Sequence, residues 1–436
     1  YAYSRNDSDI SCETSISIIR PGFSPGFGRT ALGVFAMGRI LPSQSPIPWY
    51  RQAKRASQLL MNQLGQDIAM NSRNLAALSN SIFASLNLEG ATNDLEIEIN
   101  PGVRECLLLI DGMGADAISK YGSEFPIFKE LKSLTNLDSH FPSTTATNLS
   151  SLGTGTLPGV HGMLGYTVRV PRSGEPGRLL NSLKWDERVD PRIWQSVPTL
   201  FERAAAQGIS VSHIAAKRYE GSGFTQAALR GAQYLGANQI SDIIETTVLA
   251  MQKPSAFSYV YINHLDAAGH DEGVGSEKWL LALSTVSELI TGLRNRLPKG
   301  TRLWVTADHG MVNVGEKLIL GQDNKLMENV SLVGGEPRAR HMYLREGAIN
   351  ETVAIWREFL GDKADVFSRD EVIAAELFGP QVSLDSSERM GDLIAIAKGE
   401  MVLVDPARIK EESKMVGHHG GLEAIEVAIP LLTHQN

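Results

Sequence analysis

Aspartate and histidine residues occur in short groups at several points along the chain. Two of them, Asp266 and His270, are four residues apart, which places both on one face if the segment is helical. Mixed carboxylate and imidazole ligands are those that Zn²⁺ and related transition metals prefer. The residue types and their grouping therefore predict a metal site. The groups are 111-DG-112, 266-DAAGH-270, 308-DHG-310 and 417-GHHG-420.

Hydroxyl side chains are concentrated in 140-HFPSTTATNLS-150, and a glycine-rich turn, 153-GTGTLPGVHG-162, follows. This composition is typical of a solvated Ser/Thr loop. A reactive hydroxyl is the alternative, because metal coordination can convert a weak hydroxyl nucleophile into a strong one. The composition of the segment leaves both interpretations open.

Three apolar runs must position the acidic residues. Each run is typical of a buried parallel strand and ends in an aspartate, and helical patterns lie between the runs, for example over 197–208 and 277–297. Strands that alternate with helices favour a mostly parallel sheet, whose ligands bind outside the carboxyl ends of the strands. An Asp-Gly pair is also ordinary turn chemistry, so one such case would mean little. The runs are 104-RECLLLIDG-112, 256-AFSYVYINHLD-266 and 301-TRLWVTADHG-310.

Length and composition limit the class of protein. The chain has 436 residues, 42% hydrophobic and 21% charged, as expected for one large globular α/β domain or two domains. A net charge of −8 argues against a nucleic-acid-binding surface. The two cysteines differ in context, so we expect a reduced, cytoplasmic location, with export as the alternative. The apolar runs are shorter than the roughly 20 residues of a membrane span.

The first part of the chain differs from the rest. Residues 1–70 have no sustained helical or strand period, and the short run 31-ALGVFAMG-38 lacks a clear cleavage site after it. We expect 1–70 to be a disordered or non-native extension that is dispensable. The catalytic domain is expected over 71–436 and includes a helix at 73–86.

The order of the motifs resembles the alkaline phosphatase superfamily, and within it the type I phosphodiesterase/nucleotide pyrophosphatase branch. The resemblance implies an α/β fold in which a mostly parallel sheet is sandwiched between helices. Loop or cap insertions are expected, with 165–178 and 311–325 as candidates. The matching pieces span most of the chain and are 111-DG-112, 141-FPSTTATN-148, 154-TGTLPGVHG-162, 266-DAAGH-270, 308-DHGM-311 and 417-GHHG-420.

The resemblance also implies two divalent metal ions, which we expect to be Zn²⁺, with Mn²⁺ as the alternative. His418 competes with His419 for one ligand position, and the family pattern favours His419. His161 matches no ligand position and is expected to be a structural turn residue. Carried over by position, one ion has Asp111, Asp308, His309 and Thr145 as ligands, and the other has Asp266, His270 and His419.

The same resemblance makes Thr145 the nucleophile. A helix beginning near Thr145 would favour an alkoxide and a bound phosphate through its N-terminal dipole. Asn148, one turn later, is expected to direct its amide to a phosphoryl oxygen. Two divalent ions against three carboxylates leave a charge of about +1, which attracts an anionic phosphoryl group.

We therefore predict a hydrolase that cleaves phosphodiester or pyrophosphate bonds through a phosphothreonine intermediate. Its partner is a small phosphorylated substrate, with a nucleotide as one class, and the oligomeric state is left open. No Arg or Lys lies between His140 and His161, which favours a diester or pyrophosphate over a monoester. The alternatives are a phosphonoacetate hydrolase, a phosphomonoesterase, and a non-catalytic, metal-stabilised binding protein.

Substrate contacts are harder to assign. Trp194 precedes a helical pattern in the family region beside the substrate pocket, and a core tryptophan is the competing interpretation. Arg338, Arg340 and His341 lie in a basic stretch, 334-GGEPRARHMYL-344, that could reach phosphate. A solvated loop is the competing interpretation of that stretch.

Overall fold

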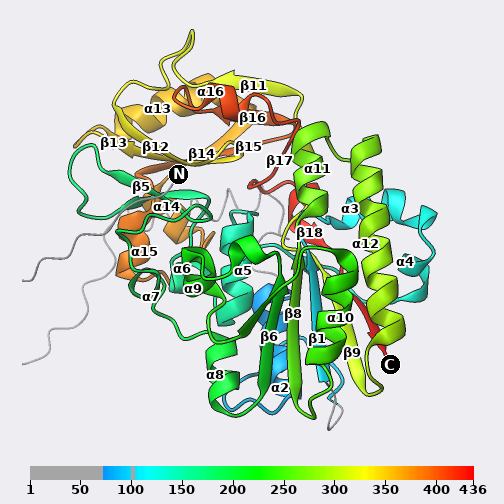
Figure 1. Ribbon diagram of the computed structural model, residues 1–436. Coiled ribbons are helices and arrows are strands. Elements are labelled where there is room, and N and C mark those ends of the chain that lie inside the picture. Colours follow the sequence, from blue (N-terminus) through cyan, green and yellow to red (C-terminus); the bar gives the residue numbers. More distant parts are fainter. Residues whose placement is uncertain (1–71, 100–103) are drawn as a thin grey trace, which may run out of the picture. The chain divides into compact units, whose positions relative to one another are not determined.

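The computed structural model describes residues 72–99 and 104–436, so the predicted extension over 1–70 lies outside the described residues. A seven-stranded sheet lies at the centre, in the order β2-β19-β9-β1-β8-β6-β7 (Figure 1). Strands β9, β1, β8, β6 and β7 pair in parallel, and β19 and β2 extend one edge antiparallel. The bounds are β1 Arg104–Ile110, β2 Lys132–Ser133, β6 Ser210–Ala215, β7 Gln233–Gly236, β8 Ala256–Ile262, β9 Thr301–Thr306 and β19 Leu432–Gln435.

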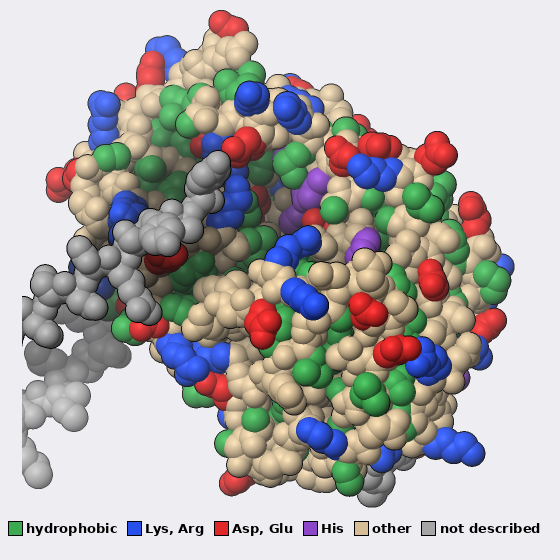
Figure 2. Space-filling model, viewed as in Figure 1, with side chains coloured by type: hydrophobic (Ala, Val, Ile, Leu, Met, Phe, Trp, Pro, Cys, Tyr) green, Lys and Arg blue, Asp and Glu red, His purple; other side chains and the backbone are tan. Residues whose placement is uncertain are grey.

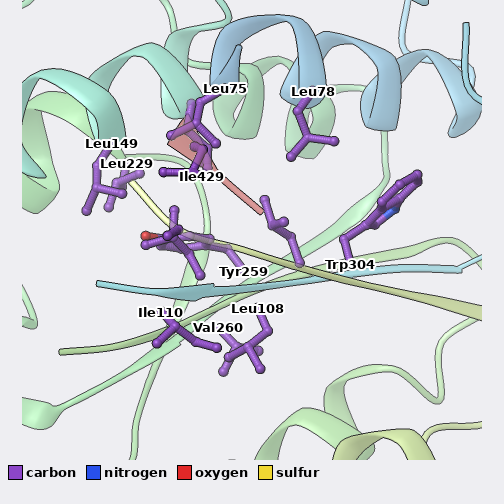
Figure 3. Close-up of a cluster of buried hydrophobic side chains, with 14 of the residues drawn as sticks. Leu75, Leu78, Leu108, Ile110, Leu149, Leu229, Tyr259, Val260, Trp304 and Ile429 are labelled. Carbon is purple, nitrogen blue, oxygen red and sulfur yellow. The ribbon is translucent and has the colours of Figure 1, made fainter. Parts of the chain in front are cut away.

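The three apolar runs form the central strands β1, β8 and β9, which confirms the mostly parallel sheet. Leu108 of β1 is level with Val260 of β8 and with Val305 of β9. Successive side chains point to opposite faces of a strand, so Tyr259 and Val260 lie on opposite sides of the sheet (Figure 3). Both faces are apolar because helices cover both of them.

Helices α2, α5 and α8 cover the face on which Tyr259 lies, and α10 and α12 cover the other (Figures 1 and 3). Phe83 of α2 and Phe201 of α8 both contact Phe257 of β8, with ring centroids 4.6 and 5.4 Å apart. The helix predicted over 73–86 is therefore part of the core. The bounds are α2 Leu75–Ser85, α5 Thr145–Thr154, α8 Leu200–Ala206, α10 Ile240–Ala250 and α12 Glu277–Arg296.

A second, antiparallel sheet is inserted after β9, in the order β12-β13-β15-β14. It packs with α13 (Ile349–Leu360) around the buried Trp356 and has a hydrophobic core of its own. This insertion is larger than the one predicted over 311–325. The other segment predicted as a loop or insertion, 165–178, contains the first strand of a hairpin, β4 and β5. The bounds are β4 Thr167–Val170, β5 Arg178–Asn181, β11 Glu316–Ile319, β12 Val330–Glu336, β13 Ala339–Leu344, β14 Ala364–Ser368, β15 Leu393–Ala397 and β16 Met401–Val404.

Short elements complete the described chain. Within its two ranges, no helix is both long enough and apolar enough to cross a membrane. The remaining helices are α3 Ala115–Tyr121, α4 Ile127–Glu130, α6 Pro158–His161, α7 Pro191–Trp194, α9 Gly223–Ala228, α11 His264–Glu272, α14 Arg369–Ala374, α15 Leu384–Arg389, α16 Ile409–Glu412 and α17 Ala424–Val427. The remaining strands are β3 Leu137–Asp138, β10 Val312–Asn313, β17 Gly417–His418 and β18 Ala428–Ile429.

Candidate metal centre and active site

The carboxyl ends of three neighbouring strands bring the acidic residues together. Asp111 follows β1, Asp308 follows β9, and Asp266 lies in the first turn of α11, directly after β8. His270 lies one helical turn beyond Asp266. His419 follows β17, which pairs with β10 beyond the end of β9. The loop containing His419 thereby reaches the edge of the sheet at which the aspartates meet.

Short distances join these side chains into two adjoining groups. Nε2 of His309 lies 3.3 Å from Oδ1 of Asp111 and 3.5 Å from Oδ2 of Asp308. Oδ1 of Asp266 lies 3.2 Å from Nε2 of His270 and 3.6 Å from Nε2 of His419. Two sets have ligand atoms that all lie within 4.8 Å of one another, namely Asp111, Asp308 and His309, and Asp266, His309 and His419. The first set matches a predicted trio. The second contains His309 in place of His270.

Backbone carbonyls orient all three imidazoles. Nδ1 of His270 lies 2.7 Å from the carbonyl oxygen of Gly417. Nδ1 of His309 lies 2.9 Å from that of Gly310, and Nδ1 of His419 lies 2.8 Å from that of Ser143. A carbonyl only accepts, so each Nδ1 is the protonated nitrogen. In the neutral ring, the Nε2 lone pair then faces the carboxylates. This is the arrangement that histidine ligands of metals adopt.

The carboxylates have matching unpaired atoms. Oδ1 of Asp111, Oδ1 of Asp266 and Oδ2 of Asp308 are buried without a hydrogen-bond partner among the described residues. Burial and the neighbouring Asp111 raise the pKa of Asp308. Burial opposes a charge on His309, but the carboxylates, Asp308 foremost, outweigh it and raise the pKa of His309 to about 10. Carboxylate oxygens and imidazole nitrogens that converge in this way fit bound cations.

Thr145 is the first residue of α5, and its hydroxyl lies against this centre. Oγ1 of Thr145 is 3.2 Å from Nε2 of His309. Ser143 ties the preceding loop to the histidine loop, because its Oγ donates to the carbonyl of Gly421 at 2.8 Å and accepts from the N–H of Gly420 at 3.1 Å. Thr145 is therefore placed at a buried helix N-terminus, where backbone N–H groups favour an anion.

A cavity of about 340 Å³ opens onto this centre. Figure 2 shows histidine side chains at the edge of a hollow in this face of the molecule. Much of the lining is aromatic or aliphatic, and Arg408 is the only Lys or Arg among the described lining residues. The lining includes Asp111, Thr145, Asp266, His270 and His419, together with Tyr166, Leu183, Tyr219, Phe224, Leu229, Glu336, Arg408 and Met415.

The side chain of Asn148, predicted to contact a phosphoryl oxygen, is directed toward the loop before Thr145. Its Oδ1 accepts from the N–H of His140 at 2.7 Å. Its Nδ2 donates to the carbonyls of His140 at 3.2 Å and Thr144 at 3.1 Å. The side chain of Asn148, three residues beyond Thr145, therefore faces the 140–144 loop, and its hydrogen bonds hold that loop in place.

The four residues considered as substrate contacts do not line the cavity. Trp194 is buried beside the guanidinium of Arg389, 3.8 Å from its ring centroid, so the competing interpretation of a core tryptophan holds. The stretch 334–344 forms the buried hairpin β12–β13 and is neither a phosphate contact nor a solvated loop. Its side chains are used internally: Arg340 pairs with Glu412, Arg338 pairs with Glu426, and His341 accepts from the N–H of Gly391 at 3.1 Å.

Two further histidines differ in their surroundings. Nε2 of His418 lies 3.2 Å from the carbonyl of Glu412, so it faces away from the carboxylates, and His419 takes the position beside Asp266. His161 accepts from the N–H of Met163 at 3.1 Å and lies 3.0 Å from Oγ of Ser151. These contacts are those of a structural turn residue.

Sequence reasoning missed several residues at the site. Tyr261 donates to Oδ2 of Asp111 and lines the cavity. The alternation of strand 256–262 could have identified it, because Tyr261 points to the same side as Tyr259. Glu336 and Arg408 belong to the inserted region, where no motif in the sequence distinguishes them.

Comparisons with known proteins identify a family and similar folds. A family model described as type I phosphodiesterase/nucleotide pyrophosphatase matches residues 106–422. No match was found among the curated proteins. The fold is similar to that of murine ectonucleotide pyrophosphatase/phosphodiesterase 5, with a TM-score of 0.60 and 17% identity over 76% of this chain and 88% of that chain. An inactive threonine-to-alanine variant of the murine protein, solved in complex with AMP, has a TM-score of 0.60 and 16% identity, again over 76% of this chain and 88% of that chain.

A phosphonoacetate hydrolase from Sinorhizobium meliloti, solved in complex with phosphonoacetate, is also similar. Its TM-score is 0.59, with 17% identity over 77% of this chain and 90% of that chain. At these identities the structural likeness shows the fold alone. The choice between the two chemistries must come from the residues of this chain.

Proposed function

Because this chain belongs to the type I phosphodiesterase/nucleotide pyrophosphatase family, within the alkaline phosphatase superfamily, we propose that it hydrolyses phosphodiester or pyrophosphate bonds through Thr145. The observation that supports this most directly is the hydroxyl of Thr145, 3.2 Å from Nε2 of His309 at the N-terminus of α5. A nucleophile in that place attacks a phosphoryl group that the same helix N-terminus attracts.

Two divalent ions fit the proposed site. Asp111, Asp308, His309 and Thr145 would hold one ion. Asp266, His270 and His419 would hold the other, with Zn²⁺ as the first choice and Mn²⁺ as the second. When bound, such ions lower the pKa of a hydroxyl and stabilise phosphoryl oxygens by Lewis acidity.

Residues of the chain itself carry out the bond-making step and position the reacting groups. Oγ1 of Thr145 gives up its proton to solvent and forms a bond to phosphorus, while the bond between phosphorus and the leaving oxygen breaks and that oxygen leaves with the electron pair. Water then breaks the bond between phosphorus and Oγ1 and regenerates the threonine. Tyr261 keeps Asp111 oriented by donating to its Oδ2, and Asn148 keeps the loop before Thr145 in place.

The cavity favours a substrate with an apolar or planar part beside the phosphoryl group. Tyr219, Phe224 and Leu229 line it, and Arg408, the only Lys or Arg among the described lining residues, lies 3.6 Å from Glu412. Rings of this kind stack on planar groups, so a nucleotide is the proposed substrate class, as in the AMP complex of the murine relative. A phosphonoacetate hydrolase is the second candidate on the likeness to that enzyme, but a small doubly anionic substrate would find few cations here.

Steady-state kinetics of the zinc-loaded protein test the proposal. We expect kcat/KM for bis-p-nitrophenyl phosphate to exceed that for p-nitrophenyl phosphate, because the sequence has no Arg or Lys between His140 and His161 to neutralise a second negative charge near Thr145. A monoester preference would reassign the enzyme as a phosphomonoesterase. Efficient cleavage of phosphonoacetate with slow diester turnover would favour the second candidate.

A further inference from the structure

Arg408 brings a positive charge to the wall of the cavity, and its position is held by local contacts. It directly precedes α16, in a turn in which Oδ1 of Asp405 accepts from the N–H of Ala407 at 2.9 Å. The carbonyl of Asp405 accepts from the N–H of Arg408, also at 2.9 Å. The guanidinium lies 5.6 Å from the ring centroid of Tyr166, another lining residue. The side chain remains 27% exposed, so a ligand in the cavity can reach it.

The acidic neighbours of Arg408 leave most of its hydrogen-bonding capacity unused. Nη2 donates to Oε2 of Glu411 at 3.2 Å, but Glu411 is 66% exposed, and an ion pair in water contributes little to stability. Nη1 lies 3.6 Å from Oε1 of Glu412, which is too long for a hydrogen bond, and Oε2 of Glu412 pairs with Arg340. A guanidinium has several N–H donors, and the side chain of Arg408 makes no other hydrogen bond to the described residues.

One wall of the cavity connects Arg408 with the candidate metal centre. Nε2 of His418 lies 3.2 Å from the backbone carbonyl of Glu412, and His418 directly precedes His419, which lies beside Asp266. Glu412, His418 and His419 line the cavity, as Arg408 does. The guanidinium therefore lies along the wall that contains the proposed metal ligand His419.

Apolar side chains line another part of the same cavity. Phe224 belongs to α9, which lies beside α5, whereas Arg408 belongs to the inserted region (Figure 1). Both residues and Thr145 line one cavity, whose volume of about 340 Å³ is typical of a small-molecule site. A ligand that fills this volume contacts an apolar wall, the candidate metal centre and a cation.

We propose that Arg408 binds a second anionic group of the substrate, a phosphate joined to the phosphoryl group that Thr145 attacks. The proposal rests on the proposed function and narrows its substrate class to nucleotides with a pyrophosphate bond. The proposed ions bind the phosphoryl group under attack. For a neighbouring phosphate, Arg408 is the only Lys or Arg that the described lining offers. A guanidinium suits this group because its planar N–H groups bind two phosphate oxygens together.

The same contact assists cleavage. When Oγ1 of Thr145 forms its bond to phosphorus, the bond from that phosphorus to the bridging oxygen breaks. The neighbouring phosphate then leaves with the electron pair of that bond and gains a negative charge. Arg408 stabilises this charge, and a diester with an uncharged leaving group does not use the contact.

Kinetics with two substrates test the role of Arg408. Diadenosine pyrophosphate has a second anionic phosphate, and bis-p-nitrophenyl phosphate has none. On the zinc-loaded protein, we measure the ratio of kcat/KM for the pyrophosphate to kcat/KM for the diester. We expect Arg408→Met to lower this ratio by roughly 10- to 100-fold, the effect of a hydrogen bond between charged groups. A ratio is insensitive to partial loss of folded or metal-loaded protein.

Lys410→Met is the matched control. Lys410 lies on α16, is exposed and is not among the described lining residues, so the substitution removes the same charge outside the cavity. We expect its ratio to stay within about threefold of that of the unsubstituted protein. Arg408→Lys keeps the charge but cannot form two parallel hydrogen bonds, so its ratio should lie between those of the unsubstituted protein and Arg408→Met.

The proposal is overturned if Arg408→Met keeps the ratio of the unsubstituted protein, or if Lys410→Met lowers the ratio as far as Arg408→Met does. If Arg408→Met does not fold, Arg408→Lys decides: a lowered ratio supports the contact, and an unchanged ratio contradicts it.

Binding of ADP and AMP, measured by calorimetry on the zinc-loaded Thr145→Val protein, needs no turnover. ADP has the neighbouring phosphate that AMP lacks. We expect Arg408→Met to lower the ratio of ADP affinity to AMP affinity by roughly the same 10- to 100-fold. If the unsubstituted protein cleaves neither diesters nor pyrophosphates but this pattern is found, the proposed function fails and the role of Arg408 stands. If diesters are cleaved and the affinity ratio is unchanged, the role of Arg408 alone is overturned.

Discussion

The imidazole rings of His309 and His419 stack face to face, with centroids 3.6 Å apart and planes inclined by 13°. Each ring has its Nδ1 at a backbone carbonyl, and each has its Nε2 close to a carboxylate oxygen. Two residues far apart in the sequence are thus held in parallel, with their Nε2 atoms facing carboxylates. This arrangement supports the metal centre proposed at this edge of the sheet.

Removal of metal should therefore inactivate and destabilise the protein. Protein purified without chelator is expected to contain close to two equivalents of zinc by elemental analysis. A chelator should abolish turnover and lower the melting temperature, because the carboxylates are then buried together without compensation; a ligand at 1,000 times its dissociation constant contributes about 4 kcal/mol. Added zinc or manganese should restore activity. One equivalent or none, with no activity regained, would contradict the two-ion site.

The two histidines 270 and 418 should differ in their effect on metal content. Nε2 of His270 faces Asp266, whereas Nε2 of His418 faces the carbonyl of Glu412. We expect His270→Gln to lose one equivalent of zinc and His418→Gln to keep both, as measured by elemental analysis after dialysis. Equal loss in the two variants would show that the 417–420 loop as a whole, and not one ring, determines metal binding.

Asn148→Ala should act mainly through stability. The substitution removes hydrogen bonds to His140 and Thr144, so the free energy of unfolding should fall by roughly 1–3 kcal/mol in denaturant titration. Asn148→Asp retains the acceptor for the N–H of His140, so its free energy of unfolding should fall less. A kcat reduced more than 100-fold in Asn148→Ala, with unchanged stability, would instead place the amide at the reacting phosphoryl group.

Acid should destabilise the protein through buried neutral histidines. Burial lowers the pKa of His213 to about 3, so between about pH 6.5 and 3 the unfolded chain binds a proton that the folded chain does not. The stability present above pH 6.5 is therefore lost as the pH falls through this window. In chelator, His213→Phe should lower the slope of unfolding free energy against pH by about 1.4 kcal/mol per pH unit. An unchanged slope would contradict a neutral buried His213.

The sequence predicted those parts of the site that lie where regular strands end. Asp111, Asp266 and Asp308 each follow a buried apolar run, and parallel pairing brings such ends together whatever the loops do. The direction in which a helical side chain points, in contrast, depends on the tertiary contacts available to it. Asn148 has the expected spacing from Thr145, yet the 140–144 loop offers its amide nearer partners.

The inserted sheet was the less predictable part of the fold. Its basic stretch 334–344 suggested contact with phosphate or exposure to solvent. The structure buries that stretch because Glu412 and Glu426 approach from distant segments to pair with its arginines. Local sequence contains no information about such partners, and for the same reason Glu336 could not be identified as a site residue.

The most direct test of the account is diester turnover by a matched pair of threonine variants. Thr145→Val removes the hydroxyl 3.2 Å from His309, whereas Thr147→Val removes a buried hydroxyl of the same helix that has no hydrogen-bond partner in the described chain. With zinc bound, we predict that Thr145→Val loses at least roughly 1,000-fold in kcat for bis-p-nitrophenyl phosphate, while Thr147→Val stays within about tenfold of the unsubstituted protein. Comparable activity in Thr145→Val and the unsubstituted protein would contradict Thr145 as the nucleophile.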